Sequence, residues 1–258
     1  MIEPVESLIL CEGFHDRDFW KGWLKYLGCK DARSRDGERD SLQVSTSSGI
    51  VNTKEFVFAT PGDAPVRVRP CHGQRMVLEN LRIHLLQRET RPVRRLIVGL
   101  DNDAIVGEQS SEGRARALLQ RVRDIVAKLD PQHEHRDDGD LALDGGRTLV
   151  SLVLWSTDDP AAPHLPAQQT LERLVCVSLC AAYPIRGDSV AAWLAARPDA
   201  PPAGPKEFAW SHMAGWYAEN GCGDFYQCVW RDPGIARELR RILEASGAWR
   251  VATALVGP

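Results

Sequence analysis

The stretch SLILCEGFHDRDFWKGWLKYLG, residues 7–28, decides the predicted fold. It opens on SLILC, an apolar run of strand length, and the run ends at the Glu12-Gly13 turn. Large apolar side chains then recur at helical spacing until Gly28: Phe19, Trp20, Trp23, Leu24 and Leu27. The pattern predicts a buried strand, a tight turn and a helix, an arrangement typical of α/β proteins.

The same two patterns recur along the chain. Apolar runs predict further strands at residues 55–60, 66–71, 94–100 and 148–155. Amphipathic stretches predict helices at residues 76–87, 110–129 and 168–183. Because strands alternate with helices, we expect an α/β fold with a mostly parallel sheet and helices on both faces. The polar residues 30–54 and the acidic residues 130–146 show no period and are predicted to be loops.

The proline-rich stretch DAPPAGP, residues 199–205, reads as a linker. We expect an α/β core over residues 1–190, with an insertion at about 30–90, and a helical, tryptophan-rich C-terminal extension over residues 191–258. Aromatic side chains of this extension could stack on nucleic-acid bases, although their helical spacing favours a packed subdomain. They are Trp210, Trp216, Tyr217, Phe225, Tyr226 and Trp230.

Composition excludes several classes of protein. The chain has 258 residues, a formal net charge of −3 and 43% hydrophobic residues, which is ordinary for a globular protein and argues against disorder throughout. No apolar run approaches the length of a membrane helix, and acids stand where a secretory signal carries basic residues, so we expect a cytoplasmic protein. The charge argues against a broadly basic nucleic-acid coat and leaves room for a local basic groove. The seven cysteines form no CxxC pair, and histidines at zinc-ligand spacing are missing.

Carboxylates stand at the ends of two predicted strands. Glu12 follows the first strand, and Asp101 and Asp103 follow the strand at 94–100. Ligands of open α/β sheets bind beyond the carboxyl ends of the strands, where we expect these acids to converge and Asp101 and Asp103 to point the same way. Converging carboxylates repel one another unless a cation neutralises them, and an all-oxygen donor set favours Mg²⁺ or Mn²⁺. A single aspartate after a strand is otherwise typical of a helix cap or turn.

The two segments LILCEGFHDRDFW (8–20) and LIVGLDNDAIVG (96–107) resemble the two motifs of a TOPRIM domain. That domain occurs in topoisomerases, primases and OLD-family nucleases. The long spacing between the motifs is similar to that of stand-alone OLD-like members. The resemblance implies a TOPRIM, Rossmann-like sheet, and it covers residues 5–28 and 94–125 most closely.

The resemblance also implies roles for individual residues. Glu12 resembles the family's acid–base and metal-contacting glutamate, and Asp101 and Asp103 resemble its metal-binding aspartates. Asp16 matches a further metal-binding acid of the nuclease branch. In TLERLV, Glu172 resembles a ligand of a second metal ion, or is a solvent-facing helix acid. The Ser-x-Ser pair that the family carries near that second ion has no match in this sequence. The resemblance therefore leaves open whether one or two ions bind.

Basic residues that could contact phosphate are more weakly indicated. Lys206 resembles a late lysine of the same branch, although an ordinary surface lysine fits the sequence as well. Five arginines lie within residues 82–95, shortly before Asp101, and we expect Arg94 and Arg95 to form a phosphate-binding rim.

Two functions follow from these features. The first is a metal-dependent phosphodiesterase acting on DNA or RNA, a nuclease that could serve as the effector of a bacterial anti-phage system. The alternative is a regulatory TOPRIM module, or one that binds nucleic acid or nucleotides, that acts only beside an ATPase partner, or a non-catalytic protein. No P-loop sequence is present, so ATP would have to be handled by that partner. Oligomerisation is possible, and no membrane association is expected.

Overall fold

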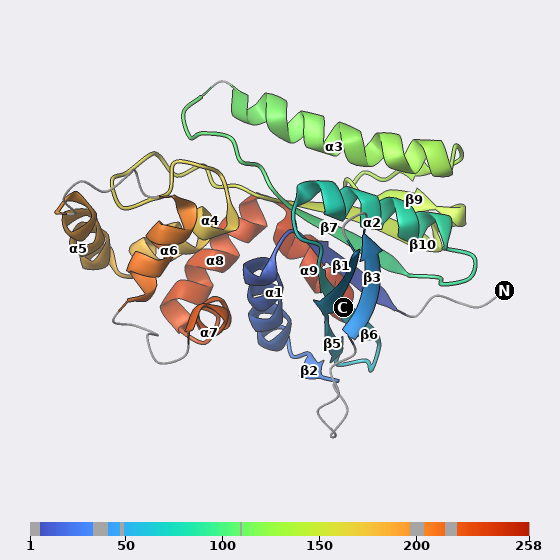
Figure 1. The fold of residues 1–258 in the computed structure, drawn as a ribbon, viewed down its shortest axis with the longest axis horizontal. Coiled ribbons are helices and arrows are strands. Elements are labelled where there is room, and N and C mark those ends of the chain that lie inside the picture. Colours follow the sequence, from blue (N-terminus) through green and yellow to red (C-terminus); the bar gives the residue numbers. More distant parts are fainter. Residues whose placement is uncertain are drawn as a thin grey trace. The chain divides into compact units, whose positions relative to one another are not determined.

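A computed structural model describes residues 6–32, 41–46, 49–108, 110–196, 204–214 and 221–257 of the chain (Figure 1). Its contacts divide the chain into two compact units, each built from more than one segment. Unit 1 comprises Met1–Leu100, Leu119–Val153 and Arg250–Pro258. Unit 2 comprises Asp101–Leu118 and Leu154–Trp249. This division differs from the expected one at residue 190, because the segment after β7 groups with the later helices and the last segment groups with the sheet.

An eight-stranded sheet forms the centre of unit 1, in the order β2-β5-β6-β1-β7-β10-β9-β8. The last residue of β7 and the last two of β10 are assigned to unit 2. The strands are β1 (Ser7–Cys11), β2 (Lys30–Asp31), β5 (Phe56–Ala59), β6 (Pro65–Pro70), β7 (Arg95–Asp101), β8 (Glu134–His135), β9 (Leu141–Leu143) and β10 (Thr148–Trp155).

The middle of this sheet is parallel. Ser7 of β1 is aligned with Val66 of β6 on one side and with Arg95 of β7 on the other. The start of β10 lies beside the start of β7, because Leu149 donates its N–H to the carbonyl of Arg94 at 3.0 Å. The outer pairs β2–β5, β5–β6, β9–β10 and β8–β9 are antiparallel. The expected mixed α/β fold with a largely parallel central sheet is therefore confirmed.

Burial explains why the opening stretch folds as it does. Leu8, Ile9 and Leu10 are completely buried, as expected for a central strand covered on both faces. The helix that follows, α1 (Phe14–Tyr26), buries Trp20 and Trp23, whose rings stack with centroids 4.7 Å apart. The first strand and the first helix thus supply much of the core of unit 1.

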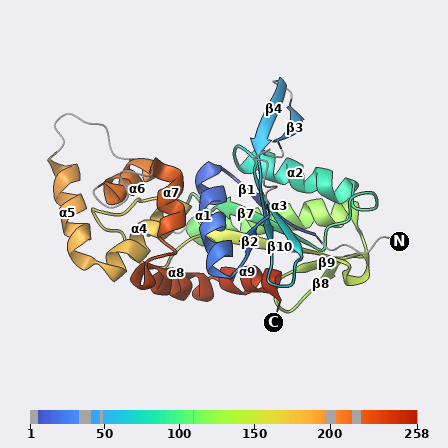
Figure 2. The ribbon, with the colours of Figure 1, turned by 90° about the horizontal axis from the view of Figure 1, so that it is seen from below.

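The strand order places helices on opposite faces of the sheet. In the sheet, β6 lies on one side of β1 and β7 lies on the other. The connection from β1 to β6 and the connection from β6 to β7 therefore run in opposite directions across the sheet. Right-handed crossovers therefore put α1 and α2 (Gln74–Leu86) on opposite faces. Figure 2 shows β1 and β7 between these two helices. The helix between β7 and β10 is α3 (Ser110–Leu129), and a short 3-10 turn, η1 (Asp144–Gly146), precedes β10.

Two predicted loops contain strands. Residues 30–54 include a separate hairpin of β3 (Ser41–Thr46) and β4 (Gly49–Lys54), so the loop prediction is wrong there. Residues 130–146 contain the short edge strands β8 and β9. The alternation of Leu42 and Val44 with polar residues was a period-2 signal for β3.

Unit 2 is mainly helical. Helix α4 packs against α5, α6 and α8. The five helices wholly assigned to this unit are α4 (Leu171–Ala182), α5 (Pro184–Ala195), α6 (Pro205–Met213), α7 (Gly221–Cys228) and α8 (Pro233–Ala245). Helix α9 (Ala248–Val256) belongs to unit 1 from Arg250 onward. Most of the predicted linker at 199–205 lies outside the described residues.

The aromatic side chains of the C-terminal region have two different environments. Phe225, Tyr226 and Trp230 are at most 3% exposed, which fits the predicted packed subdomain. Trp210 is 47% exposed, whereas Trp216 and Tyr217 lie outside the described residues. Across the described part of the chain, no helix has both the length and the apolar character needed to cross a bilayer.

Candidate functional site

In unit 1, Glu12 is the first residue after β1. Its side chain is half-buried, and its backbone carbonyl accepts a hydrogen bond from Gly73 N at 2.8 Å. The preceding carbonyl, of Cys11, accepts from Cys71 N at the same distance. These bonds extend the pairing of β1 and β6 beyond the strand ends, so the backbone of Glu12 is fixed beside the start of α2.

Asp16 has a structural role at the start of α1. Its Oδ2 accepts a hydrogen bond from the backbone N–H of Gly13 at 3.1 Å, and the residue is 5% exposed. This is the reciprocal part of a capping box, which satisfies an N–H that a helix start leaves without an intrahelical partner. A carboxylate has further lone pairs, so the predicted metal contact of Asp16 stays a prediction.

A buried arginine that sequence reasoning missed lies in the same helix. Arg17 is 9% exposed and forms an ion pair with Asp18 at 3.2 Å. Its guanidinium also lies over the rings of Phe56, at 4.1 Å, and Phe14, at 4.9 Å. Burial raises the pKa of Asp18, and the charge of Arg17 opposes that rise. These contacts place the cation between its own helix and strand β5.

In unit 2, Asp101 lies at the start of helix α4. Its Oδ1 accepts a hydrogen bond from the backbone N–H of Leu171 at 2.9 Å, and Leu171 is the first residue of that helix. Glu172 follows Leu171 and is 7% exposed. The structure thus brings two predicted metal ligands, Asp101 and Glu172, to one helix N-terminus, where the positive end of the helix dipole stabilises carboxylates.

Asp103 is held differently. Its φ of 55° lies in the left-handed region, and its N–H donates to the carbonyl of Gln169 at 2.9 Å. Its Oδ2 lies 3.5 Å from Arg114, and the side chain is 42% exposed. Because β7 ends at Asp101, strand alternation does not relate the two aspartates. The prediction that strand alternation points Asp101 and Asp103 the same way is therefore wrong.

Asn102, between the two aspartates, is a residue that sequence reasoning did not single out. It is 3% exposed, and its Nδ2 lies 3.4 Å from Ser111 Oγ. Its Oδ1 is buried and has no hydrogen-bond partner among the described residues. An unsatisfied buried acceptor costs roughly 1–3 kcal/mol, so this oxygen is suited to a water molecule or a cation.

The donor chemistry of this region suits a hard divalent cation. Asp101, Asp103 and Glu172 provide carboxylate oxygens, and Mg²⁺ commonly binds through one or two carboxylates while keeping several waters. Within the described ranges, no three or more His, Cys, Asp or Glu side chains form a ready-made metal cage. The expected convergence of Glu12, Asp101 and Asp103 on one ion is therefore not shown among the described residues, and the metal site stays a prediction.

A second buried arginine, Arg173, holds the chain segment that leads into α4. It is completely buried, and its guanidinium donates to the carbonyls of Pro166, Asp159 and Pro160 at 2.5–3.0 Å. Those carbonyls belong to the segment between β10 and α4. A charged residue inside an apolar helical stretch was the available sequence signal for such a role.

The basic residues expected to contact phosphate occupy other positions. Arg94 and Arg95 lie at the start of β7, and a strand of this length puts Asp101 roughly 20 Å away at its other end. Arg95 is also paired with Asp140 at 2.7 Å. Their prediction as a rim beside Asp101 is therefore not supported. Lys206 is exposed in the first turn of α6, and its phosphate contact stays a prediction.

Comparison with known proteins identifies the fold and nothing finer. The chain matches no protein-family model and no curated protein. It is similar to the crystal structure of the hypothetical protein PH0156 from Pyrococcus horikoshii OT3, with a TM-score of 0.62 and 17% sequence identity. The similarity covers 98% of this chain and 99% of that one. The two chains therefore share an α/β fold over nearly their full lengths.

Proposed function

We propose that the protein is a Mg²⁺- or Mn²⁺-dependent phosphodiesterase with a TOPRIM, Rossmann-like sheet, and that it cleaves DNA or RNA. The order of the central strands carries this proposal. They lie as β6-β1-β7-β10, so the chain reverses direction across the sheet at β1 and β7. Open α/β sheets bind ligands at the carboxyl edge of such a reversal. Glu12 follows β1 and Asp101 ends β7, and these two strands are parallel neighbours.

The proposed roles follow from the chemistry of the side chains. Asp101 and Asp103 bind the ion from the β7 end, with Glu172 as a further ligand and Asp16 as a second candidate. A bound divalent ion supplies a lower pKa for an attacking water and offsets charge on the phosphate. Glu12 accepts the proton of that water on a carboxylate oxygen. The N–H of Leu171 keeps the Asp101 carboxylate in one orientation.

A cleavage screen tests the proposal. The purified chain is incubated with single-stranded DNA, duplex DNA, plasmid and RNA, with Mg²⁺, Mn²⁺ or EDTA. We expect metal-dependent cleavage that Glu12→Gln and Asp101→Asn both abolish. Glu112→Gln, which changes an exposed acid of α3 paired with Arg116, is the matched control and retains activity. Full activity in both site variants would overturn the assignment.

One observation favours a second candidate, a non-catalytic or regulatory module that works beside an ATPase partner. The acids also have local partners: Asp16 in the α1 cap, Asp101 at the start of α4, and Asp103 beside Arg114. Carboxylates used in this way need no metal. Calorimetry with Mn²⁺ separates the candidates, since a folded chain that takes up no ion supports this second one. Cleavage that appears only when an ATPase is added would support the partnered form.

A further inference from the structure

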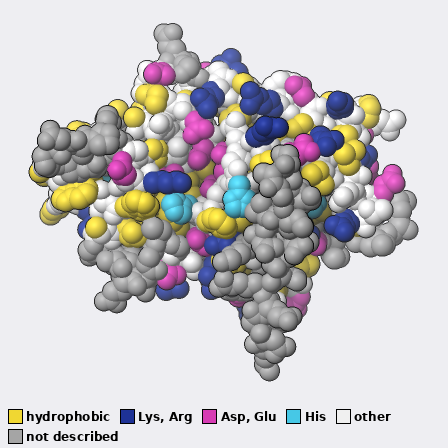
Figure 3. Space-filling view, viewed as in Figure 1, with side chains coloured by type: hydrophobic (Ala, Val, Ile, Leu, Met, Phe, Trp, Pro, Cys, Tyr) yellow, Lys and Arg dark blue, Asp and Glu magenta, His cyan; other side chains and the backbone are white. Residues whose placement is uncertain are grey.

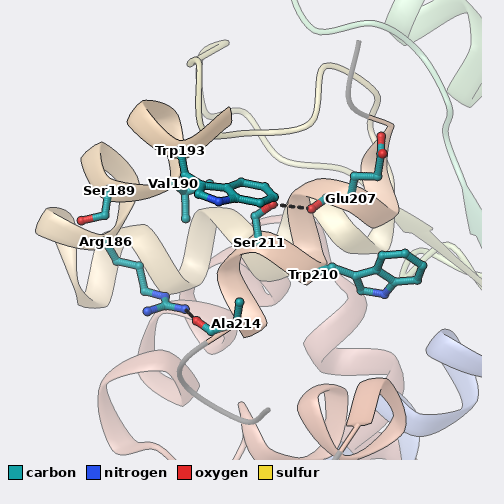
Figure 4. A pocket seen from close by; sticks show the side chains of 8 residues that line it. All are labelled: Arg186, Ser189, Val190, Trp193, Glu207, Trp210, Ser211 and Ala214. Carbon is teal, nitrogen blue, oxygen red and sulfur yellow. Dashed lines mark hydrogen bonds between the residues drawn. The ribbon is translucent and has the colours of Figure 1, made fainter. Parts of the chain in front are cut away.

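An open cavity of about 410 Å³ lies between helices α5 and α6 of unit 2 (Figure 4). Cavities of this size accommodate small ligands or single groups of larger ones. The two tryptophans that line it, Trp193 of α5 and Trp210 of α6, are 58% and 47% exposed. Figure 3 shows hydrophobic side chains on the surface over these helices. The lining residues are Arg186, Ser189, Val190, Trp193, Glu207, Trp210, Ser211 and Ala214.

Hydrogen bonds hold several of the residues that line this cavity in place. Arg186 of α5 donates from Nε to the carbonyl of His212 at 3.0 Å and from Nη2 to that of Ala214 at 2.6 Å. At the other end of α6, Glu207 accepts from the N–H of Gly204 at 2.7 Å. The C-terminal end of α6 is therefore joined to α5, and its N-terminal end is capped locally.

The cavity combines aromatic surface with polar groups at its ends. In Figure 4, Trp193 lies between the cationic Arg186 on one side and the anionic Glu207 on the other. Ser189 and Ser211 add hydroxyl groups to the lining. A ligand that suits this lining is flat and aromatic, carries hydrogen-bonding edges, and has a negative charge near Arg186. A nucleotide of an unpaired strand has all three properties.

We propose that the cavity between α5 and α6 binds a base of single-stranded nucleic acid, which stacks on the indole of Trp193 and also contacts Trp210. The inference rests on the proposed function, because it names the form of nucleic acid that the enzyme takes. Arg186 supplies the cation for the phosphate next to the bound base. The buried Phe225, Tyr226 and Trp230 take no part.

Binding in EDTA tests the proposal without any cleavage. Fluorescence anisotropy is measured with a labelled oligothymidylate and with an abasic strand of equal length, which keeps the phosphates and lacks the bases. We expect Trp193→Ala and Trp210→Ala each to weaken binding of the oligothymidylate by about fivefold to a hundredfold. We expect the wild-type chain to bind the abasic strand as weakly as those variants bind the oligothymidylate. Tyr26→Ala, which removes an equally exposed aromatic side chain in unit 1, leaves the affinity unchanged.

Two further variants separate stacking from simple apolar contact. Trp193→Phe keeps an aromatic ring and is expected to retain most of the affinity, whereas Trp193→Leu keeps apolar area and is expected to lose it. Circular dichroism confirms that each variant is folded. Equal affinity in Trp193→Leu and the wild type, or equal affinity for the abasic strand and the oligothymidylate, would overturn base stacking.

The result is independent of the metal-dependent reaction. Glu112→Gln, which changes an exposed acid outside this cavity, is expected to bind the oligothymidylate as the wild type does. Base-dependent binding without any cleavage would refute the phosphodiesterase and leave the cavity assigned. Cleavage together with unchanged binding in both tryptophan-to-alanine variants would refute the cavity alone.

Discussion

The side chain of Asp101 accepts a hydrogen bond from the backbone N–H of Leu171, 70 residues further along the chain, at 2.9 Å. This bond joins the end of β7 to the first turn of α4. It fixes one oxygen of the carboxylate and places Asp101 beside the helix that carries Glu172. The same side chain thus has a structural role and a proposed catalytic one.

Two substitutions at Asp101 separate those roles. Asp101→Ala removes the acceptor for Leu171 N–H, and we expect it to lower the free energy of unfolding by about 1 kcal/mol, as for loss of a helix cap. Asp101→Asn keeps an acceptor oxygen and loses the charge, so stability is largely preserved and cleavage is lost. Urea unfolding and the cleavage assay are run on both proteins. An Asn variant with full cleavage would show that the charge is dispensable.

His84 makes unit 1 sensitive to acid. It is 6% exposed, its Nε2 lies 2.7 Å from Arg69 Nη1, and burial together with Arg69, Arg67 and Arg91 lowers its pKa to about 3. The unfolded chain therefore binds a proton more readily than the folded one between pH 6.5 and pH 3. Stability is complete above the ordinary histidine pKa and falls as the pH drops below it, by up to roughly 1.4 kcal/mol per pH unit.

Urea unfolding between about pH 4 and pH 7 checks this dependence. His84→Gln keeps an acceptor for Arg69 and cannot titrate in that range, so its stability is expected to change less steeply with pH. Identical slopes in the wild type and the variant would assign the acid sensitivity to other groups.

Asp140 is expected to be among the most sensitive single positions of unit 1. It is 1% exposed and receives hydrogen bonds from Arg95 at 2.7 Å and from Arg250 at 3.0 Å. Burial raises its pKa, but the bonds from Arg250, Ser151 and Arg95 outweigh burial and leave the pKa lowered. Asp140→Ala leaves the largely buried Arg95 without its anion, whereas Arg250 keeps Asp138 at 3.4 Å, and we expect a loss of about 2–3 kcal/mol.

Thermal or urea unfolding measures this loss, with Asp124→Asn on the exposed face of α3 as the control. Proteolysis reports the same event locally, since Arg250 lies in α9 and that helix is expected to become cleavable first. A variant within 1 kcal/mol of the control would contradict a central role for Asp140.

Two glycines inside helices are expected to respond oppositely to alanine. A Cβ at Gly187 in α5 would lie 3.0 Å from the half-buried ring of His164, whereas a Cβ at Gly113 in α3 would meet no atom within 4 Å. Alanine normally stabilises a helix interior by up to about 1 kcal/mol relative to glycine. We therefore expect Gly113→Ala to raise the melting temperature and Gly187→Ala to lower it. A rise in both would show that the His164 ring moves aside easily.

The central fold could be predicted because its signals are local. The apolar run at Leu8–Leu10 and the helical spacing of Trp20 and Trp23 each suffice to define an element, and the structure confirms both. The hairpin of β3 and β4 was missed because its alternation is short and mostly polar. The three residues of β9 were missed because they form a strand only by pairing with β8 and β10.

The arrangement of the candidate site depended on information that the sequence does not carry locally. Arg94 and Arg95 are near Asp101 along the chain, yet an extended strand separates their positions. Leu171 is distant along the chain and contacts Asp101 directly. The left-handed backbone of Asp103 likewise depends on its bond to Gln169, which fixes the path of the loop.

The segmented build of unit 1 has a consequence for protein synthesis. The Asp140 carboxylate is made 110 residues before Arg250, and helices α4 to α8 are translated in the interval. During synthesis, Arg95 and Asp140 are both present before Arg250 is made. Unit 1 can therefore complete its native ion cluster only after nearly all of unit 2 has emerged from the exit tunnel.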